Sequence, residues 1–105
     1  MVLTGAFCML ASCGAKDYSS NKYIQGSTTY YQVTSMENYF TFRKDGTGKL
    51  QLDKYTYDLV FEMTSDTTAS LEWNKAKMGS GTFSTNSNGY KEFSWSGKTY
   101  VCYSK

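Results

Sequence analysis

Residues 39–52 carry the sequence YFTFRKDGTGKLQL, which decides the fold of this chain. Apolar and polar residues alternate on both sides of the dipeptide Asp45-Gly46, a pattern typical of two β-strands joined by a short turn. Asp-Gly between alternating segments is also a strong local signal for a β-hairpin. The stretch therefore predicts a pair of antiparallel strands.

The length of the hairpin loop decides which side chains share a face of the sheet. A two-residue Asp-Gly turn would set Phe42 opposite Lys49 and mix apolar with polar residues on each face. A three-residue loop over residues 44–46, with Gly46 in the left-handed conformation, avoids this conflict. We therefore predict the three-residue loop, which gathers four apolar residues on one face: Phe40, Phe42, Leu50 and Leu52.

The same alternation recurs along the rest of the chain and predicts further strands. They are expected at residues 28–34, 55–64, 69–74, 82–84, 90–95 and 98–103. Residues 75–80 fit either a loop or a ragged strand. Because no segment has a convincing helical period, we expect an all-β fold, a small antiparallel up-and-down barrel or sandwich of about eight strands.

The last predicted hairpin turns at Ser96-Gly97. A two-residue loop there places the apolar residues of both strands on one face, namely Phe93, Trp95, Tyr100 and Cys102. Cys102 is then expected to be a buried small apolar residue rather than a reactive thiol.

The composition suits one small domain with an aromatic core. A chain of 105 residues has room for a single thin core. It contains ten Tyr, six Phe and two Trp, and each such ring buries ~150–250 Å² of surface, so a few of them can stabilise that core. The net charge of +2 comes from interspersed lysines and acids without a run of one sign, so no nucleic-acid partner is expected.

The absence of histidine from the chain restricts the chemistry. It excludes histidine-based catalytic triads and histidine zinc sites. Asp58 and Glu62 lie four residues apart on one predicted strand, about 13 Å, which exceeds the ~5–9.5 Å separation of glycosidase carboxylates. No phosphate-binding glycine loop or metal-ligand cluster is recognisable, so we expect no enzyme activity, no cofactor and no metal site.

The N-terminal residues are typical of an export signal. Residues 2–11 are apolar apart from Thr4 and too few to span a bilayer as a helix, which needs about 20 residues. Residues 10–14, LASCG, resemble the lipobox of bacterial lipoproteins, and that resemblance implies that Cys13 is lipidated. The alternative is that residues 2–10 form a buried strand and Cys13 is an ordinary core residue.

The resemblance to a lipobox divides the chain into three parts and predicts where in the cell the protein is located. Residues 1–12 are expected to be a signal peptide whose basic segment is missing from this sequence. Residues 13–27 are expected to be the lipidated cysteine with a flexible linker, and residues 28–105 the β-barrel domain. The protein is then expected in the bacterial cell envelope, held to a membrane, the outer membrane in our prediction, by the lipid on Cys13.

Six aromatic residues are the candidates for a ligand site: Tyr55, Tyr57, Trp73, Phe83, Trp95 and Tyr100. They would line a pocket for a small apolar or sugar ligand if the barrel is hollow. The alternative is that they simply fill the core of a small barrel. Tyr and Lys side chains at the strand ends are a further candidate, as a protein-binding rim.

Two family resemblances suggest functions. Residues 40–42 (FTF) and 45–48 (DGTG), followed by alternating strands with a tryptophan, resemble the lipocalin-like domains of bacterial lipoproteins, which implies a calycin-type binding barrel. Residues 79–83 (GSGTF) and 93–98 (FSWSGK) are similar to segments of the periplasmic lipoprotein inhibitors of C-type lysozyme. That similarity implies that Ser80 and Lys98 enter the lysozyme cleft.

We therefore expect a non-enzymatic, lipid-anchored envelope protein whose lipocalin-like domain binds a small ligand or a partner protein. The alternative function is inhibition of C-type lysozyme.

Overall fold

The computed structural model describes residues 16–104, and within that range it contains eight β-strands and no helix. The strands are β1 (Ser27–Gln32), β2 (Ser35–Arg43), β3 (Thr47–Leu52), β4 (Tyr55–Met63), β5 (Thr68–Trp73), β6 (Ala76–Thr85), β7 (Lys91–Trp95) and β8 (Lys98–Cys102). The predicted all-β fold is confirmed.

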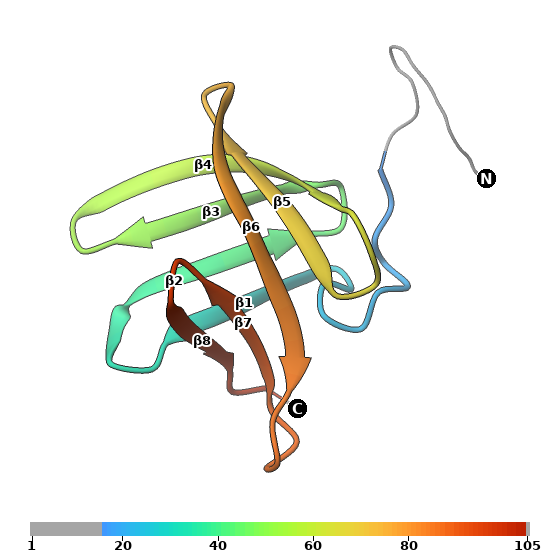
Figure 1. Cartoon of the computed structure of the whole chain (residues 1–105), viewed down its shortest axis with the longest axis vertical. Helices are drawn as coiled ribbons and strands as arrows, with labels where there is room; N and C mark the ends of the chain where they lie inside the picture. The colour runs from blue at the N-terminus through green and yellow to red at the C-terminus, as the bar shows by residue number, and fades with distance from the viewer. Residues whose placement is uncertain (1–15, 105) are drawn as a thin grey trace.

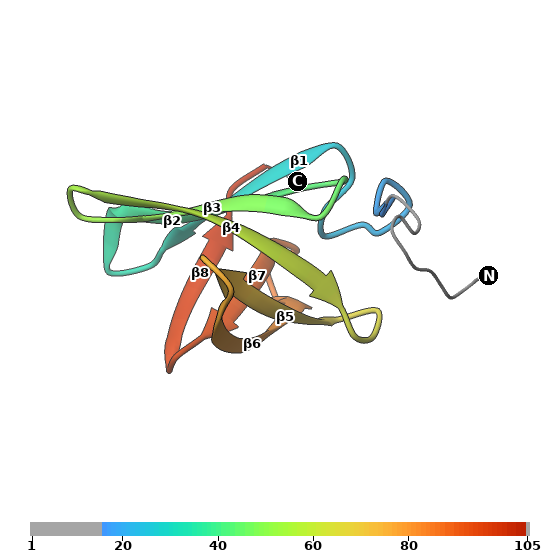
Figure 2. The same cartoon turned by 90° about the horizontal axis from the view of Figure 1, so that it is seen from above.

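Each strand pairs antiparallel with the next, and β8 pairs back to β1, so the sheet closes into an up-and-down barrel (Figure 1). The closing seam is short. It consists of the residue pairs Tyr31 with Val101 and Gln32 with Tyr100, and Val33 N–H extends it by donating to the Thr99 carbonyl. Strands β1–β4 form a layer that crosses β5–β8, so the barrel is flattened (Figure 2).

The first hairpin has the predicted three-residue loop. Phe40 lies opposite Leu50, and Phe42 lies opposite Gly48. Gly46 has a φ of +88°, the left-handed conformation that the loop requires. The Asp45 carboxylate accepts hydrogen bonds from the N–H (3.0 Å) and the hydroxyl (2.6 Å) of Thr47, which lower the pKa of Asp45 and hold the turn.

The interior of the barrel is filled by aromatic rings. Phe42 lies at its centre, with ring centroids at 4.9 to 5.9 Å from those of five neighbours: Tyr30, Phe40, Phe61, Phe83 and Phe93. All six side chains are less than 2% exposed. Cys102 is buried beside this core as predicted.

Residues 76–80 belong to a strand, which settles the segment whose conformation the sequence left open. A shift in register between Leu71 and Glu72 lets β5 pair with residues 76–82 of β6. Such a bulge breaks the two-residue alternation locally, and this explains why the sequence reads as ragged there.

The segment before β1 is packed against the barrel. Tyr23 is 6% exposed and stacks on Phe83 at 5.3 Å, and Ile24 is fully buried. Tyr18 stacks on Phe61 at 5.4 Å. The prediction of a flexible linker therefore does not hold for residues 16–26, which we call the N-terminal plug. Cys13 and the rest of the lipobox lie outside the described residues.

Two buried tyrosines differ in what their hydroxyl groups contact. The Tyr30 hydroxyl donates to the Tyr23 carbonyl at 2.7 Å, whereas the Tyr100 hydroxyl is buried with no hydrogen-bond partner among the described residues. Burial raises the pKa of both phenols. A buried hydroxyl without a hydrogen-bond partner destabilises the folded protein, whereas a hydrogen-bonded hydroxyl stabilises it.

Tyr100→Phe is therefore expected to raise the free energy of unfolding by ~1 kcal/mol, and the matched change Tyr30→Phe to lower it by ~1 kcal/mol. Urea denaturation followed by circular dichroism measures both changes. Equal destabilisation by the two substitutions would contradict the difference in hydrogen bonding.

Candidate functional site

In an up-and-down barrel, alternate turns lie at opposite ends of the barrel. The turns after β1, β3, β5 and β7 share one end, because successive strands run in opposite directions. The N-terminal plug precedes β1 and lies at the other end. In Figure 1 the turns after β1 and β3 project to the left and the plug lies to the right. We call these two ends the rim end and the plug end.

Large apolar side chains are exposed mainly at the rim end. Val33 (53% exposed), Met36 (55%), Tyr55 (58%) and Trp73 (40%) all lie in or beside its turns. Isolated exposed apolar residues are ordinary, and the presence of four at one end makes the rim end the candidate binding surface of the domain.

Four of the six predicted site residues lie at the rim end, and we call them the aromatic rim: Tyr55, Tyr57, Trp73 and Trp95. The rings of Tyr57 and Trp73 meet edge to face at 5.1 Å. Trp95 is half-buried, its indole N–H donates to the Met78 carbonyl at 2.8 Å, and its ring lies 5.4 Å from that of Phe40. Trp95 is thus fixed by the core, whereas Trp73 and Tyr55 project into solvent.

The other two predicted site residues lie in the core. Phe83 is 1% exposed and stacks on Tyr23 of the plug, and Tyr100 is fully buried against Phe40 at 4.9 Å. The six aromatic residues therefore do not line one common pocket. For Phe83 and Tyr100 the structure supports the alternative that they fill the core.

Lysines accompany the aromatic rim. Lys54, Lys75 and Lys98 are exposed in or beside three of the four rim-end turns, and the Lys54 ammonium lies 5.9 Å from the centre of the Tyr55 ring. Lys98 also lines a surface hollow of about 510 Å³, together with Gln32, Val33, Thr34, Glu92, Gly97 and Thr99. The sequence did not reveal this hollow, because it is formed only when β1 meets β8.

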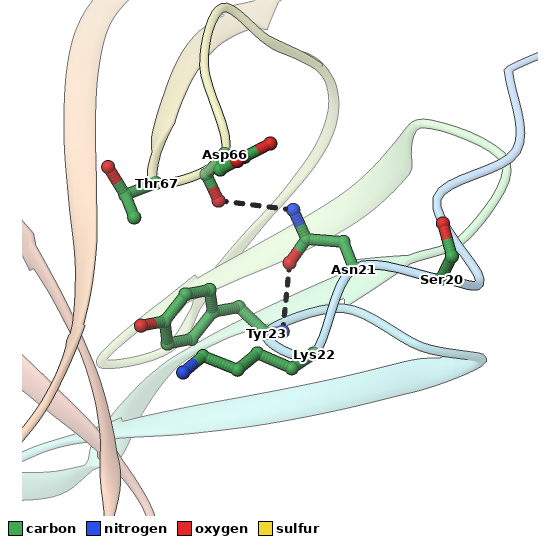
Figure 3. A pocket seen from close by; sticks show the side chains of 6 residues that line it. All are labelled: Ser20, Asn21, Lys22, Tyr23, Asp66 and Thr67. Atoms are coloured by element: carbon green, nitrogen blue, oxygen red, sulfur yellow. Dashed lines mark hydrogen bonds between the residues drawn. The ribbon is translucent and has the colours of Figure 1, made fainter.

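A second hollow, of about 470 Å³, lies at the plug end (Figure 3). Asn21 organises it, since its side-chain amide donates to the Asp66 carbonyl at 3.2 Å and its oxygen accepts from the Tyr23 N–H at 2.9 Å. The Lys22 ammonium lies 5.1 Å from the centre of the Tyr23 ring. No alternation or motif in residues 16–26 signals this hollow.

The two residues suggested by the lysozyme-inhibitor resemblance lie on separate strands. Lys98 is exposed at the start of β8, directly after the Ser96-Gly97 turn. Ser80 is exposed within β6, opposite Ser70 of β5, and so does not share a turn with Lys98.

Residues 16–104 contain neither a candidate metal site nor a candidate membrane-spanning helix. That part of the chain has no group of three or more Cys, Asp or Glu side chains placed to hold a metal ion. It also has no helix that is long and apolar enough to cross a membrane.

The eight-stranded antiparallel barrel is compatible with the calycin-like fold that the first resemblance implies. No protein-family model, curated protein or solved structure matches this chain.

Proposed function

We propose that this protein is a non-enzymatic binding protein of the bacterial cell envelope and that it contacts its partner through the aromatic rim. One observation carries the proposal: the barrel interior is filled by buried rings, while aromatic side chains at one end remain exposed. A ligand therefore meets the rim and does not enter the barrel. Tyrosine and tryptophan are the residues that most often carry binding energy at protein surfaces.

The chemistry of the rim suggests the kind of ligand. Flat aromatic faces suit the apolar faces of sugar rings, and the neighbouring lysines Lys54, Lys75 and Lys98 suit carboxylates. A glycan that carries acidic groups, or a protein surface with acidic side chains, offers both features. The proposed location in the cell envelope rests on the lipobox-like residues 10–14, with the lipid on Cys13.

A second candidate, inhibition of C-type lysozyme, is favoured by the exposure of Lys98 at a hairpin end beside the half-buried Trp95. An exposed ammonium on a short, rigid hairpin is suited to reach carboxylates at the bottom of a cleft.

Calorimetric titration with soluble peptidoglycan fragments, which combine sugar rings with carboxylates, tests the rim. We expect saturable binding that Trp73→Ala weakens at least tenfold, because the exposed ring is lost. Thr82→Ala, at an exposed position of β6 towards the plug end, is the matched control and is expected to bind like the wild type.

A parallel titration with a C-type lysozyme, with lysis of bacterial cells as the readout, separates the two functions. Inhibition that is lost in Lys98→Ala would favour the second candidate. Fragment binding unchanged in Trp73→Ala would contradict the proposed surface.

A further inference from the structure

We infer that the plug end faces the membrane that holds the protein, so that the aromatic rim is presented away from that membrane. The inference rests on the proposed lipid attachment at Cys13. It adds to that proposal a defined orientation and a defined distance, and both follow from the packing of the N-terminal plug.

The plug is fastened to the barrel from its first described residue. The Lys16 ammonium donates to the Phe61 carbonyl at 3.2 Å. The Tyr18 N–H donates to the Lys44 carbonyl at 2.8 Å, and the Tyr18 hydroxyl accepts from the Met63 N–H at 3.1 Å. These contacts reach the turn after β2 and the end of β4, so the chain enters the domain at a fixed place on the plug end.

The plug remains fixed as far as β1. Asn21 bonds to Asp66 in the turn after β4, as Figure 3 shows. Ile24 is fully buried, and its carbonyl accepts from the Thr28 hydroxyl at 2.7 Å. The residues between Lys16 and β1 therefore add nothing to the length of a tether.

The remaining tether is very short. Three peptide steps separate Cys13 from Lys16, and they span at most about 11 Å when fully extended. A flexible linker over residues 14–27 would instead have an average end-to-end distance of ~20 Å and would let the domain take any orientation relative to the membrane. Strand β4 runs from the rim end to the plug end in nine residues, or about 30 Å, so the rim lies beyond the reach of such a tether.

Charge at the plug end does not oppose this placement. Charges of both signs lie there and balance: exposed Lys16, Lys22 and Lys44 with half-buried Arg43, against exposed Asp17, Asp45, Glu62 and Asp66. The orientation therefore comes from the tether and not from attraction to acidic lipids. It follows that the partner of the aromatic rim lies in the aqueous compartment or on a structure opposite the anchoring membrane.

The two tryptophans make the orientation measurable, because Trp73 and Trp95 both lie at the rim end. The full chain with Cys8→Ser is coupled through Cys13 to a maleimide lipid in phosphatidylcholine vesicles that carry a nitroxide quencher on their head groups. Cys102 is buried and is not expected to react. Ser20→Trp adds a reporter at an exposed position of the plug.

We expect the quencher to remove less than a tenth of the tryptophan emission of the coupled Cys8→Ser protein and at least half of the emission added by Ser20→Trp. The matched control inserts a twelve-residue Gly/Ser linker between residues 15 and 16, and it should abolish the difference. Equal quenching at both ends in the short-tethered protein, or stronger quenching of the rim tryptophans, would overturn the inference.

The lipid in this experiment is supplied chemically, so the result does not depend on whether cells modify Cys13. Metabolic labelling with a clickable fatty acid, with Cys13→Ala as control, tests that step separately. Absence of label would remove the lipid anchor from the proposed function, whereas the vesicle result would still report the geometry of the plug.

Discussion

Replacing Phe42 with alanine is expected to lower the free energy of unfolding by about 3–5 kcal/mol. The Phe42 ring is fully buried and packs against five other rings, so its removal leaves a cavity that the surrounding strands cannot close. A domain of this size has a total stability of only ~5–10 kcal/mol. The variant should therefore lose about half of its stability or more, which urea denaturation followed by circular dichroism will show.

Val60→Ala is the matched control for Phe42→Ala, because Val60 is an apolar strand residue that is 46% exposed. Its loss should change the free energy of unfolding by no more than ~0.5 kcal/mol. A loss below about 1.5 kcal/mol for Phe42→Ala would mean that the core repacks around the missing ring, contrary to the filled interior described above.

Gly48→Ala is the second substitution for which we expect a large effect, a loss of ~3 kcal/mol or more. A Cβ atom at position 48 would lie 2.4 Å from the Thr41 carbonyl oxygen and 3.0 Å from Leu59 Cδ1. The first of these is a backbone atom of the neighbouring strand β2. It cannot withdraw without disturbing the pairing of β2 with β3.

The matched control for Gly48→Ala is Gly26→Ala, where an added Cβ would meet nothing within 4 Å. This variant should keep the stability of the wild type within ~0.5 kcal/mol. Comparable thermal denaturation curves for the two alanine variants would contradict the close approach of the strands at Gly48.

Local alternation was enough to predict the strands and the loop of the first hairpin. It predicted the shared face of Phe40, Phe42 and Leu50, since each of these positions depends only on its neighbours along the strand. It did not predict the N-terminal plug. Tyr23 and Ile24 are two apolar residues within a polar segment and show no period, and they are buried only because the end of a barrel lies beneath them.

The candidate site, too, could be predicted only in part from the alternation of residues along each strand. Alternation tells which face of the sheet a side chain joins, but not how far along the barrel axis it lies. Phe83 and Trp73 therefore look equivalent in the sequence, although one is buried under the plug and the other is exposed at the rim. Their depth depends on the order of the turns, which is a property of the closed barrel.

The short seam between β1 and β8 bears on when the protein can fold. The first strand of the barrel closes against the last, so this pairing joins the most distant parts of the domain, and contacts of that kind form slowly. During synthesis the barrel stays open until Val101 has emerged, because Val101 pairs with Tyr31 in the seam. Closure of the barrel is therefore a late step of folding, and before it the strands β1–β7 can pair only as an open sheet.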